Sequence, residues 1–375
     1  MTTTDIVIGS GMKVGVTREE FIASLAVVAR GVSTRTAVQI LSGVQLRAED
    51  GLLHLAATDM ELSLRTSMPA RIDAAASVVV PGRLLAELSR LLPEGDVELE
   101  GGAEEGVLRV SCGSASYTLH TYSAEDFPRL PEVEAASLFA LDRDAFLDTV
   151  SRVSRAASRD ESRPVLTGIL VRFEGGTLVM AATDSYRLAV KQTAVSAGAD
   201  LEALVPARAL SEVQRLAAAA DALELGVLEN QVVFELGGTT LTSRRIDGQF
   251  PNYKALLPEN FENEVVLPRG ELLDVVRRVA VMAQRNAPLR LRFSEGELTV
   301  TARTPDVGEA TESLPAPYSG DPLEIGFNAE FLRDGIDSVE GDDVRLKLIS
   351  PLRPAVLQGT ETDFTYLIMP IRLAG

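Results

Sequence analysis

Residues 165–184 read VLTGILVRFEGGTLVMAATD, and residues 40–59 read ILSGVQLRAEDGLLHLAATD. The two segments align without a gap at an offset of 125 residues (184 minus 59), and ten of their twenty residues are identical. Each alternates apolar and polar residues around a turn, Gly175-Gly176 in one and Asp50-Gly51 in the other, which is typical of a β-hairpin. A fainter copy at residues 289–304 indicates that the hairpin recurs in each third of the chain.

Two predicted helices flank each hairpin. Thr17 followed by Glu20 forms a capping-box pattern, which predicts a helix that ends near Arg30. Its counterparts span residues 142–158 and 268–284, and the second helix of each third is predicted at residues 81–91, 206–216 and 328–336. Each third is therefore expected to pack two helices on one face of a mainly antiparallel sheet, which is an α+β architecture.

The repeat is domain-sized, so we expect three tandem domains. Proline-containing loops, Phe127-Pro128 to Pro131 and Phe250-Pro251 to Pro258, are typical of strand ends and indicate boundaries near residues 135 and 260. The predicted domains are residues 1–135, 136–260 and 261–375. Residues 1–11 are expected to form a loose leader before the first strand.

The composition restricts the class of protein. A single cysteine, Cys112, excludes an internal disulfide, and the first residues have no secretory pattern. No apolar run approaches the roughly 20 residues of a membrane helix, so a soluble, cytoplasmic protein is expected. The net charge of −18 argues against polyanion partners unless basic residues gather locally.

Arginines do gather on the predicted helices. At 100° per residue, Arg152, Arg155 and Arg159 fall opposite the apolar stripe of their helix. The same arrangement recurs in the other helices, with Arg83, Arg90, Arg208, Arg215, Arg277, Arg278 and Arg285. A solvated helix face would explain each helix alone. The repetition against the overall charge equally favours a basic surface that holds phosphates without reading bases.

No catalytic, metal or cofactor site is expected. His54 and His120 are too few for a metal cluster, and no glycine-rich phosphate loop is present. Thr58-Asp59 and Thr183-Asp184 end the hairpins and could supply catalytic carboxylates. A turn in which each aspartate accepts backbone N–H groups is favoured, because the third copy has Arg303-Thr304-Pro305 instead.

Three motifs carry a resemblance to a known family. They are residues 182–189 (ATDSYRLA), 250–253 (FPNY) and 366–373 (YLIMPIRL). With the three tandem repeats, they resemble the β sliding clamps, the processivity factors of bacterial DNA polymerase III, over essentially the whole chain. The resemblance implies a head-to-tail homodimer whose six domains form a ring around duplex DNA, with helices inside and sheets outside.

The resemblance also implies sites and partners. The partners would be double-stranded DNA bound without sequence preference, a second copy of the chain, and the replicative polymerase, clamp loader and other proteins that carry short apolar motifs. The family is not enzymatic. Carried over by position, the peptide-binding residues are Leu166, Thr183, Ser185, Arg187, Leu188, Pro251, Ala255, Leu256, Leu367, Met369, Pro370, Ile371 and Arg372.

The DNA-contacting loop arginine of the family matches Arg35, and Arg163 is its counterpart in the second domain. Ring closure implies contact between Tyr117 and Leu119 of one chain and Val281 and Met282 of the other. Some members have glycine where this chain has Ser185, and a longer basic residue where it has Ala255.

Two other classes stay open at this point. An enzyme that uses Asp59 and Asp184 would need both carboxylates in one cleft, although the repeat places them in different domains. A scaffold that binds only proteins would explain the apolar C-terminal segment and leave the helix arginines without a role.

Overall fold

The computed structural model describes residues 11–33, 37–102, 106–130, 138–195, 200–283 and 287–373. Its contacts divide the chain into two compact units, Met1–Leu141 with Arg215–Arg244, and Asp142–Gln214 with Arg245–Gly375. The two units therefore share the middle third of the sequence. The predicted boundary at residue 135 lies outside the described residues, and both boundaries stay predictions.

The predicted helices are confirmed to within a few residues. Thr17 caps the first helix by accepting the N–H of Glu20, and a 3-10 turn at Ala29–Gly31 follows its end. Asp142 caps the equivalent helix by accepting the N–H of Ala145 at 3.1 Å. The helices are α1 (Arg18–Val28), α2 (Gly82–Leu91), α3 (Arg143–Ser154), α4 (Ala207–Ala217), α5 (Arg269–Ala280) and α6 (Ala329–Ser338).

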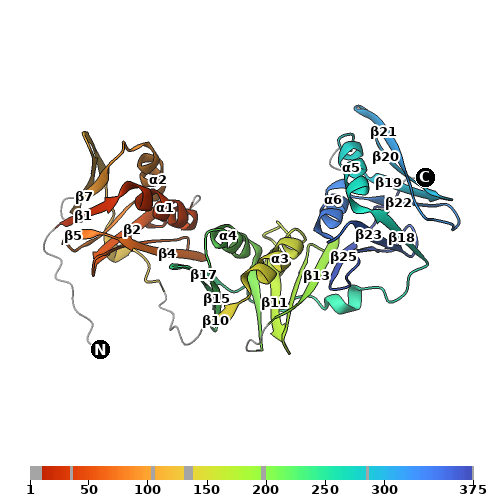
Figure 1. Ribbon diagram of the computed structural model, residues 1–375, viewed down its shortest axis with the longest axis horizontal. Helices are drawn as coiled ribbons and strands as arrows, with labels where there is room; N and C mark the ends of the chain where they lie inside the picture. The colour runs from red at the N-terminus through yellow and green to blue at the C-terminus, as the bar shows by residue number, and fades with distance from the viewer. Residues whose placement is uncertain are drawn as a thin grey trace. The chain divides into compact units, whose positions relative to one another are not determined.

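The first unit contains two antiparallel sheets (Figure 1). One has the order β5 (Arg71–Ala74), β1 (Met12–Thr17), β7 (Asp96–Gly102), β8 (Val107–Cys112) and β9 (Ala115–His120). The other has the order β10 (Phe139–Leu141), β15 (Leu223–Val227), β16 (Gln231–Leu236), β17 (Thr239–Arg244), β4 (Leu62–Pro69), β3 (Leu52–Thr58), β2 (Gly43–Glu49) and β6 (Ser77–Pro81). Helix α1 packs against β3 and β4.

The second unit repeats this plan. Its eight-stranded sheet has the order β14 (Leu201–Pro206), β11 (Gly168–Glu174), β12 (Thr177–Thr183), β13 (Arg187–Ala194), β25 (Phe364–Ile368), β24 (Ala355–Gln358), β23 (Asp343–Leu348) and β18 (Asn263–Pro268). Its four-stranded sheet has the order β21 (Gly308–Pro315), β20 (Glu297–Thr304), β19 (Leu289–Ser294) and β22 (Leu323–Phe327). Helix α3 packs on β12 and β13, and α5 packs on β20, β21 and α6.

The predicted hairpins are β2–β3, β11–β12 and β19–β20. Each turns at a glycine in the left-handed region, with φ of 77° at Gly51, and 75° at Gly176 and Gly296. A residue other than glycine rarely adopts this backbone conformation, so the repeated glycine has a direct physical cause.

The predicted apolar stripes of the helices are confirmed by their burial. The residues Phe146, Val150, Leu272 and Val276 are all buried.

Each eight-stranded sheet joins strands from two different thirds of the sequence. We call the pairing of β4 with β17 the first junction and the pairing of β13 with β25 the second junction; in Figure 1 the strands of each pair lie side by side. Leu64 is opposite Leu241, and Ala189 is opposite Tyr366, so the two registers are identical at the 125-residue offset. The repeat therefore extends to how successive thirds pair.

No helix within the described ranges is long and apolar enough to cross a membrane.

Candidate functional site

The aspartates at the hairpin exits are architectural, as favoured from the sequence. The carboxylate of Asp59 accepts the N–H of Leu62 at 2.8 Å, and that of Asp184 accepts the N–H of Tyr186 at 2.9 Å. Thr183 Oγ1 in turn donates to the carbonyl oxygen of Arg187 at 2.7 Å. These bonds close tight turns after β3 and β12 and occupy the groups that a catalytic carboxylate would need.

The remaining reactive side chains are dispersed. Cys112 is buried and its thiol lies 3.1 Å from the carbonyl oxygen of Pro93. Burial lowers the pKa of His54 below the ordinary histidine value. Within the described part of the chain, no group of three or more His, Cys, Asp or Glu side chains is arranged to hold a metal ion.

The residues predicted to bind peptides all belong to the second unit. Leu166 lies in a short 3-10 turn at Pro164–Thr167, and a second such turn at Tyr253–Leu256 follows Pro251. The C-terminal segment runs beside the turn that precedes β13, because the N–H of Met369 donates to the carbonyl oxygen of Tyr186 at 2.8 Å. The N–H of Ile371 then donates to the carbonyl oxygen of Gly326 at 2.7 Å.

Burial divides this predicted site into a floor and a rim. Leu188 and Leu367 are opposite each other across β13 and β25, and both are below 5% exposed within a cluster that includes Leu170 and Tyr253. Thr183 and Leu166 are also buried. The rim consists of exposed or half-exposed residues: Ser185, Pro251, Ala255, Leu256, Met369, Pro370, Ile371 and Arg372. A peptide could contact the rim directly, whereas the floor supports it from below.

Arg187 is the centre of a buried ionic network. It is 7% exposed, and its guanidinium donates to Asp184 at 3.0 Å and to Asp334 of α6 at 2.7 Å. It also lies over the ring of Phe331, 4.2 Å from the centroid. Burial disfavours its charge, but Tyr366 and these carboxylates raise its pKa above the ordinary arginine value. Arg187 therefore joins β13 to α6 beneath the predicted site, and its donors are directed into the protein.

Tyr186 is a rim residue that the sequence analysis missed. It is 61% exposed, and its carbonyl oxygen holds the start of the C-terminal segment. It follows Ser185, whose φ of 81° is unusual for a residue other than glycine and turns the chain outward. The turn residues before it, Thr183-Asp184, indicate that Tyr186 lies in a loop, and loops are usually at the surface.

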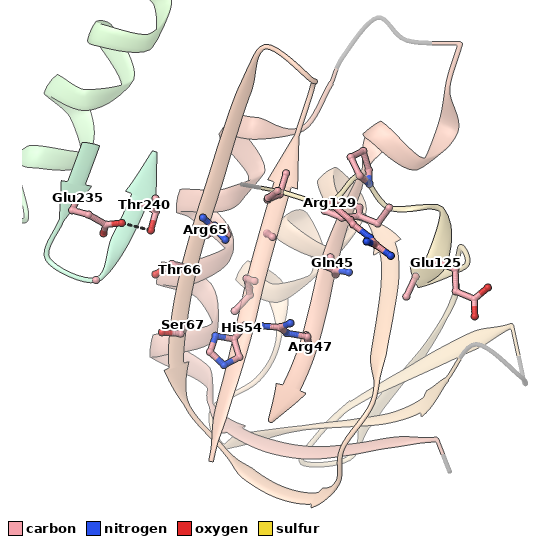
Figure 2. A pocket seen from close by; sticks show the side chains of 17 residues that line it. Gln45, Arg47, His54, Arg65, Thr66, Ser67, Glu125, Arg129, Glu235 and Thr240 are labelled. Atoms are coloured by element: carbon pink, nitrogen blue, oxygen red, sulfur yellow. Dashed lines mark hydrogen bonds between the residues drawn. The ribbon is translucent and has the colours of Figure 1, made fainter. Parts of the chain in front are cut away.

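The first junction has different chemistry at the equivalent positions. Leu170, Val179 and Val190 of the second unit correspond at the 125-residue offset to Gln45, His54 and Arg65. Figure 2 shows these polar side chains beside Arg47 on three neighbouring strands, lining an open pocket with a volume of about 1210 Å³. The buried apolar cluster around Leu188 is therefore a property of the second junction, although both junctions share one backbone plan.

Two of the predicted DNA-binding arginines connect α3 to α6 through ion pairs and hydrogen bonds. Arg152 is only 15% exposed; it pairs with Asp148 at 2.9 Å and with Glu340 at 3.0 Å, and it donates to the carbonyl oxygen of Ser338. Arg155 pairs with Asp337 of α6. Both residues hold α3 against α6, so their substitution would disturb the second junction as well as any DNA contact.

The other predicted DNA-binding arginines are exposed where the structure describes them. Arg278 pairs with Glu312 at 2.7 Å, and Arg163 pairs with Asp160 at 3.3 Å. Arg35 and Arg285 lie outside the described residues. The exposed arginines are Arg83, Arg90, Arg159, Arg163, Arg208, Arg215, Arg277 and Arg278.

The residues predicted to close a ring lie at the edges of sheets and at a helix end. Tyr117 and Leu119 belong to β9, which ends the five-stranded sheet of the first unit. Tyr117 is 37% exposed and Leu119 is buried. Val281 and Met282 follow the end of α5, and Val281 is 76% exposed.

Comparison with known proteins agrees with this arrangement. Family models of the DNA polymerase III beta subunit match the chain in order, with the N-terminal domain at residues 12–131, the central domain at 140–252 and the C-terminal domain at 254–372. A beta sliding clamp of Streptomyces coelicolor is 36% identical, with 97% of this chain and 100% of the relative covered.

Solved structures agree as well. The beta sliding clamp of C. crescentus is 30% identical with a TM-score of 0.91, over 97% of this chain and 100% of that chain. A sliding clamp of Pseudomonas aeruginosa, bound to griselimycin, is 30% identical with a TM-score of 0.88 over the same shares. The chain therefore belongs to the family of bacterial DNA polymerase III beta subunits, the beta sliding clamps.

Proposed function

We propose that two copies of this chain pair head to tail into a ring around duplex DNA, where the ring tethers the replicative polymerase and other proteins of DNA metabolism. The ring catalyses no reaction, and it acts in the cytoplasm, where the bacterial chromosome lies. The observation that carries the proposal is the pattern of strand pairing. It leaves two edge strands, β9 and β21, that are equivalent to the strands paired at the two junctions.

The unpaired edges follow from the two junctions. Strand β4 of the first third pairs with β17 of the second third, and β13 of the second third pairs with β25 of the last third. In both cases, a strand that follows the hairpin of one third pairs with the last strand of the next third. By the same rule the remaining partners are β21 and β9, and each of these forms the edge of its sheet. A strand at the edge of a sheet has unpaired backbone N–H and C=O groups, which favour pairing with a strand of another chain. Head-to-tail pairing of two chains would cover both edges of both chains.

The repeat also supports one register for this contact. Ala310 pairs with Ala302 as Ala189 pairs with Ala182, and Tyr117 pairs with Val110 as Leu241 pairs with Phe234. At each junction, Ala189 or its equivalent Leu64 lies opposite Leu241 or its equivalent Tyr366. Ala310 is the third equivalent of Ala189, and Tyr117 is the third equivalent of Leu241. Tyr117 is therefore expected opposite the partner's Ala310. The neighbouring outward-facing pair is then Thr118 and the partner's Glu309.

Substitution of Thr118 by glutamate tests the ring and its register together. The new carboxylate would lie opposite the partner's Glu309, and like charges that face each other destabilise a strand pair. We expect the dimer Kd to rise about tenfold, since the ring contains two such contacts. The chain that carries both Thr118→Glu and Glu309→Lys should regain the wild-type Kd, measured by sedimentation.

Retention on DNA provides the functional readout. Wild-type rings loaded on a nicked circle should elute with the circle and leave it after linearisation, and Thr118→Glu should shorten the lifetime on the circle. A dimer that is insensitive to both substitutions would reject the register, and wild-type protein that leaves circular and linear DNA equally fast would reject the ring.

The helix arginines account for a DNA-facing surface on an acidic protein. Removing Arg159, Arg208 and Arg215 by alanine should weaken binding to any duplex sequence, and should lower the slope of log K against log salt by about 0.9 for each phosphate that is no longer neutralised. Arg159 follows the end of α3, Arg208 and Arg215 lie on α4, and all three are exposed. Fluorescence anisotropy with two unrelated duplexes measures both effects.

The matched control removes three arginines from strands. Arg109, Arg290 and Arg345 are half-exposed and change the net charge by the same amount. If the strand and helix variants lose equal affinity, the loss reflects net charge, and the helices do not face the DNA.

A further inference from the structure

The open pocket at the first junction is lined by residues outside the predicted ring contacts and the predicted peptide site. It lies on the face of its sheet opposite α1, since successive strand residues point to opposite faces. Arg65 lines the pocket, whereas its neighbour Leu64 is buried, and α1 packs on β4, which carries both residues. We call this hollow the cationic pocket, after the basic residues of its lining, Arg47, His54, Arg65 and Arg129 (Figure 2).

Strand register brings these side chains together from separate elements. Arg47 is opposite His54 across β2 and β3, and Arg65 is opposite Thr240 across the first junction itself. Directly opposed strand residues have Cβ atoms about 4.5–5.5 Å apart. Arg129 comes from the segment after β9 and lines the same pocket. The pocket is therefore built by the strand pairing that joins two thirds of the sequence.

The lining reverses the sign of charge of the chain. Three arginines and two glutamates line the pocket, which gives a formal charge of +1 (3 minus 2), whereas the whole chain carries −18. The glutamates are Glu125 and Glu235, and the hydroxyl of Thr240 donates to Glu235 at 2.6 Å. Glu49 pairs with Arg47 at 2.6 Å beside the pocket. A positive excess inside a concave surface attracts anionic ligands, so the pocket favours an anion on an otherwise acidic protein.

The equivalent place at the second junction is filled by the chain itself. There Tyr253 packs with Leu170 and Val190 in one buried cluster. Tyr253 ends the motif Phe-Pro-Asn-Tyr, and its equivalent at the first junction is Leu130, which ends the motif Phe-Pro-Arg-Leu and is half-buried. The first junction has a leucine in place of the tyrosine and polar residues in place of the apolar strand positions. The space that is packed at the second junction is therefore open at the first.

The cationic pocket also lies at the counterpart of the predicted peptide site. Pro128 lines the pocket, and it is the equivalent of Pro251 on the rim of that site. Leu188 of the floor corresponds to Ser63, which is two residues from Arg65 on β4 and therefore on the same face. The backbone plan thus repeats a hollow beside a connecting segment, with an apolar lining at the second junction and a basic lining at the first.

Carboxylates are the anions that fit this lining best. A planar guanidinium binds a carboxylate through two parallel hydrogen bonds, and Gln45 and Ser67 of the lining add further donors. The volume of about 1210 Å³ exceeds the roughly 300–1,000 Å³ of small-molecule pockets, so it admits several residues of a peptide. Leu130 of the lining provides a surface for an apolar side chain.

A nucleic acid fits the same pocket less well. It carries a phosphate at every nucleotide, and some of these phosphates would lie against Glu125 and Glu235. A peptide instead has backbone N–H groups that can donate to these carboxylates, while its acidic side chains reach the arginines.

We infer that the cationic pocket is a second docking site for partner proteins, and that it binds a short acidic segment whose carboxylates pair with Arg65 and Arg129 and whose apolar side chain contacts Leu130. The site goes beyond the proposed ring and the apolar peptide site, because all its residues belong to the first unit of one chain. Two sites of one plan thus select segments of different chemistry.

A fluorescein-labelled peptide in which glutamates flank one leucine tests the site by anisotropy, against the same peptide with glutamines. Wild-type protein should bind the glutamate peptide about tenfold more tightly, although the net charge of −18 favours the opposite order. Arg129→Gln should raise the Kd about threefold, and Arg65→Gln with Arg129→Gln roughly 30-fold. Glu125→Gln should lower the Kd about threefold, because it removes a repelling carboxylate.

Two control variants separate this site from other surfaces. Arg292→Gln alters an exposed arginine on the strand face of another sheet and should leave the Kd unchanged. Leu256→Ala with Met369→Ala alters the rim of the apolar site and should bind the glutamate peptide normally. Circular dichroism confirms that each variant is folded. If the double arginine variant does not fold, Arg129→Gln and Glu125→Gln still decide the outcome, since their expected effects have opposite signs.

Three results would overturn the inference and leave the proposed ring intact. The first is equal wild-type affinity for the glutamate and glutamine peptides, or Arg129→Gln and Glu125→Gln variants that bind as wild type does. The second is loss of the glutamate peptide in the rim variant, which would assign that peptide to the apolar site. The third is tighter wild-type binding of a labelled oligonucleotide that the arginine variants lose equally, which would make the pocket a nucleic-acid site.

Discussion

Replacing Arg187 by methionine is expected to lower the free energy of unfolding by about 3–5 kcal/mol, the usual loss when one partner of a buried ionic network is removed. The substitution leaves Asp184 and Asp334 without their main cation, and both carboxylates are less than 15% exposed. Methionine keeps much of the packing against Phe331, so the loss reports the charge. Urea unfolding followed by circular dichroism measures it.

The control for this prediction is Arg303→Met, which alters an exposed arginine of β20. It should change stability by less than about 0.5 kcal/mol, as surface substitutions usually do. If Arg187→Met costs no more than the control, the network is not a stabilising element of the second junction. A variant that stays fully stable but loses peptide affinity would instead return Arg187 to a direct role in binding.

The second large effect concerns the rim of the predicted peptide site. Leu256 is 51% exposed and Met369 is 39% exposed, so both can gain buried area when an apolar motif binds. Because binding energy concentrates in a few buried anchors, Leu256→Ala with Met369→Ala should cost about 1–4 kcal/mol of peptide affinity. A fluorescent peptide with leucine and phenylalanine anchors, titrated by anisotropy, measures this loss.

Stability should be unaffected in this pair, because both side chains are exposed in the free chain. Val266→Ala, at a strand residue with 39% exposure, is the matched control and should bind the peptide normally. Equal affinities for the rim variant and the control would remove the rim from the site. Unchanged dimerisation of the rim variant shows that the two surfaces are separate.

Leu188 illustrates how structure changes the experiment. The resemblance implies that this residue lines the peptide-binding groove. In the structure it is 1% exposed and packs with Leu170, Tyr253 and Leu367. Leu188→Ala would open a cavity and cost about 2–5 kcal/mol of stability, so it would not isolate a binding effect.

The sequence predicts the local elements well because their signals are local. The hairpin glycines at Gly51 and Gly176 and the caps Thr17 and Asp142 act within a few residues. The pairing of β4 with β17 joins segments about 175 residues apart, for example Leu64 with Leu241. No local pattern encodes such a pairing, and the eight-stranded sheets were therefore not expected.

The resemblance names the residues of the predicted peptide site but not the contacts that hold them. It includes Arg187 and Leu188, which both lie on β13. It could not show that Arg187 is neutralised by Asp334, a residue 147 positions later that reaches it only through the packing of α6. For the same reason, the sequence does not predict the ion pair of Arg152 with Glu340, which lies 188 residues later in the chain.

Because Cys112 is buried, the protein exposes no thiol to reagents. It is the only cysteine in the sequence, and it is 1% exposed. Any cysteine introduced on the surface would therefore supply the sole accessible thiol. Opposed residues on adjacent strands lie within the range that a disulfide can bridge. Paired cysteines at Tyr117 and Ala310 would thus convert the proposed ring into a covalently closed link around DNA, free of competing cross-links.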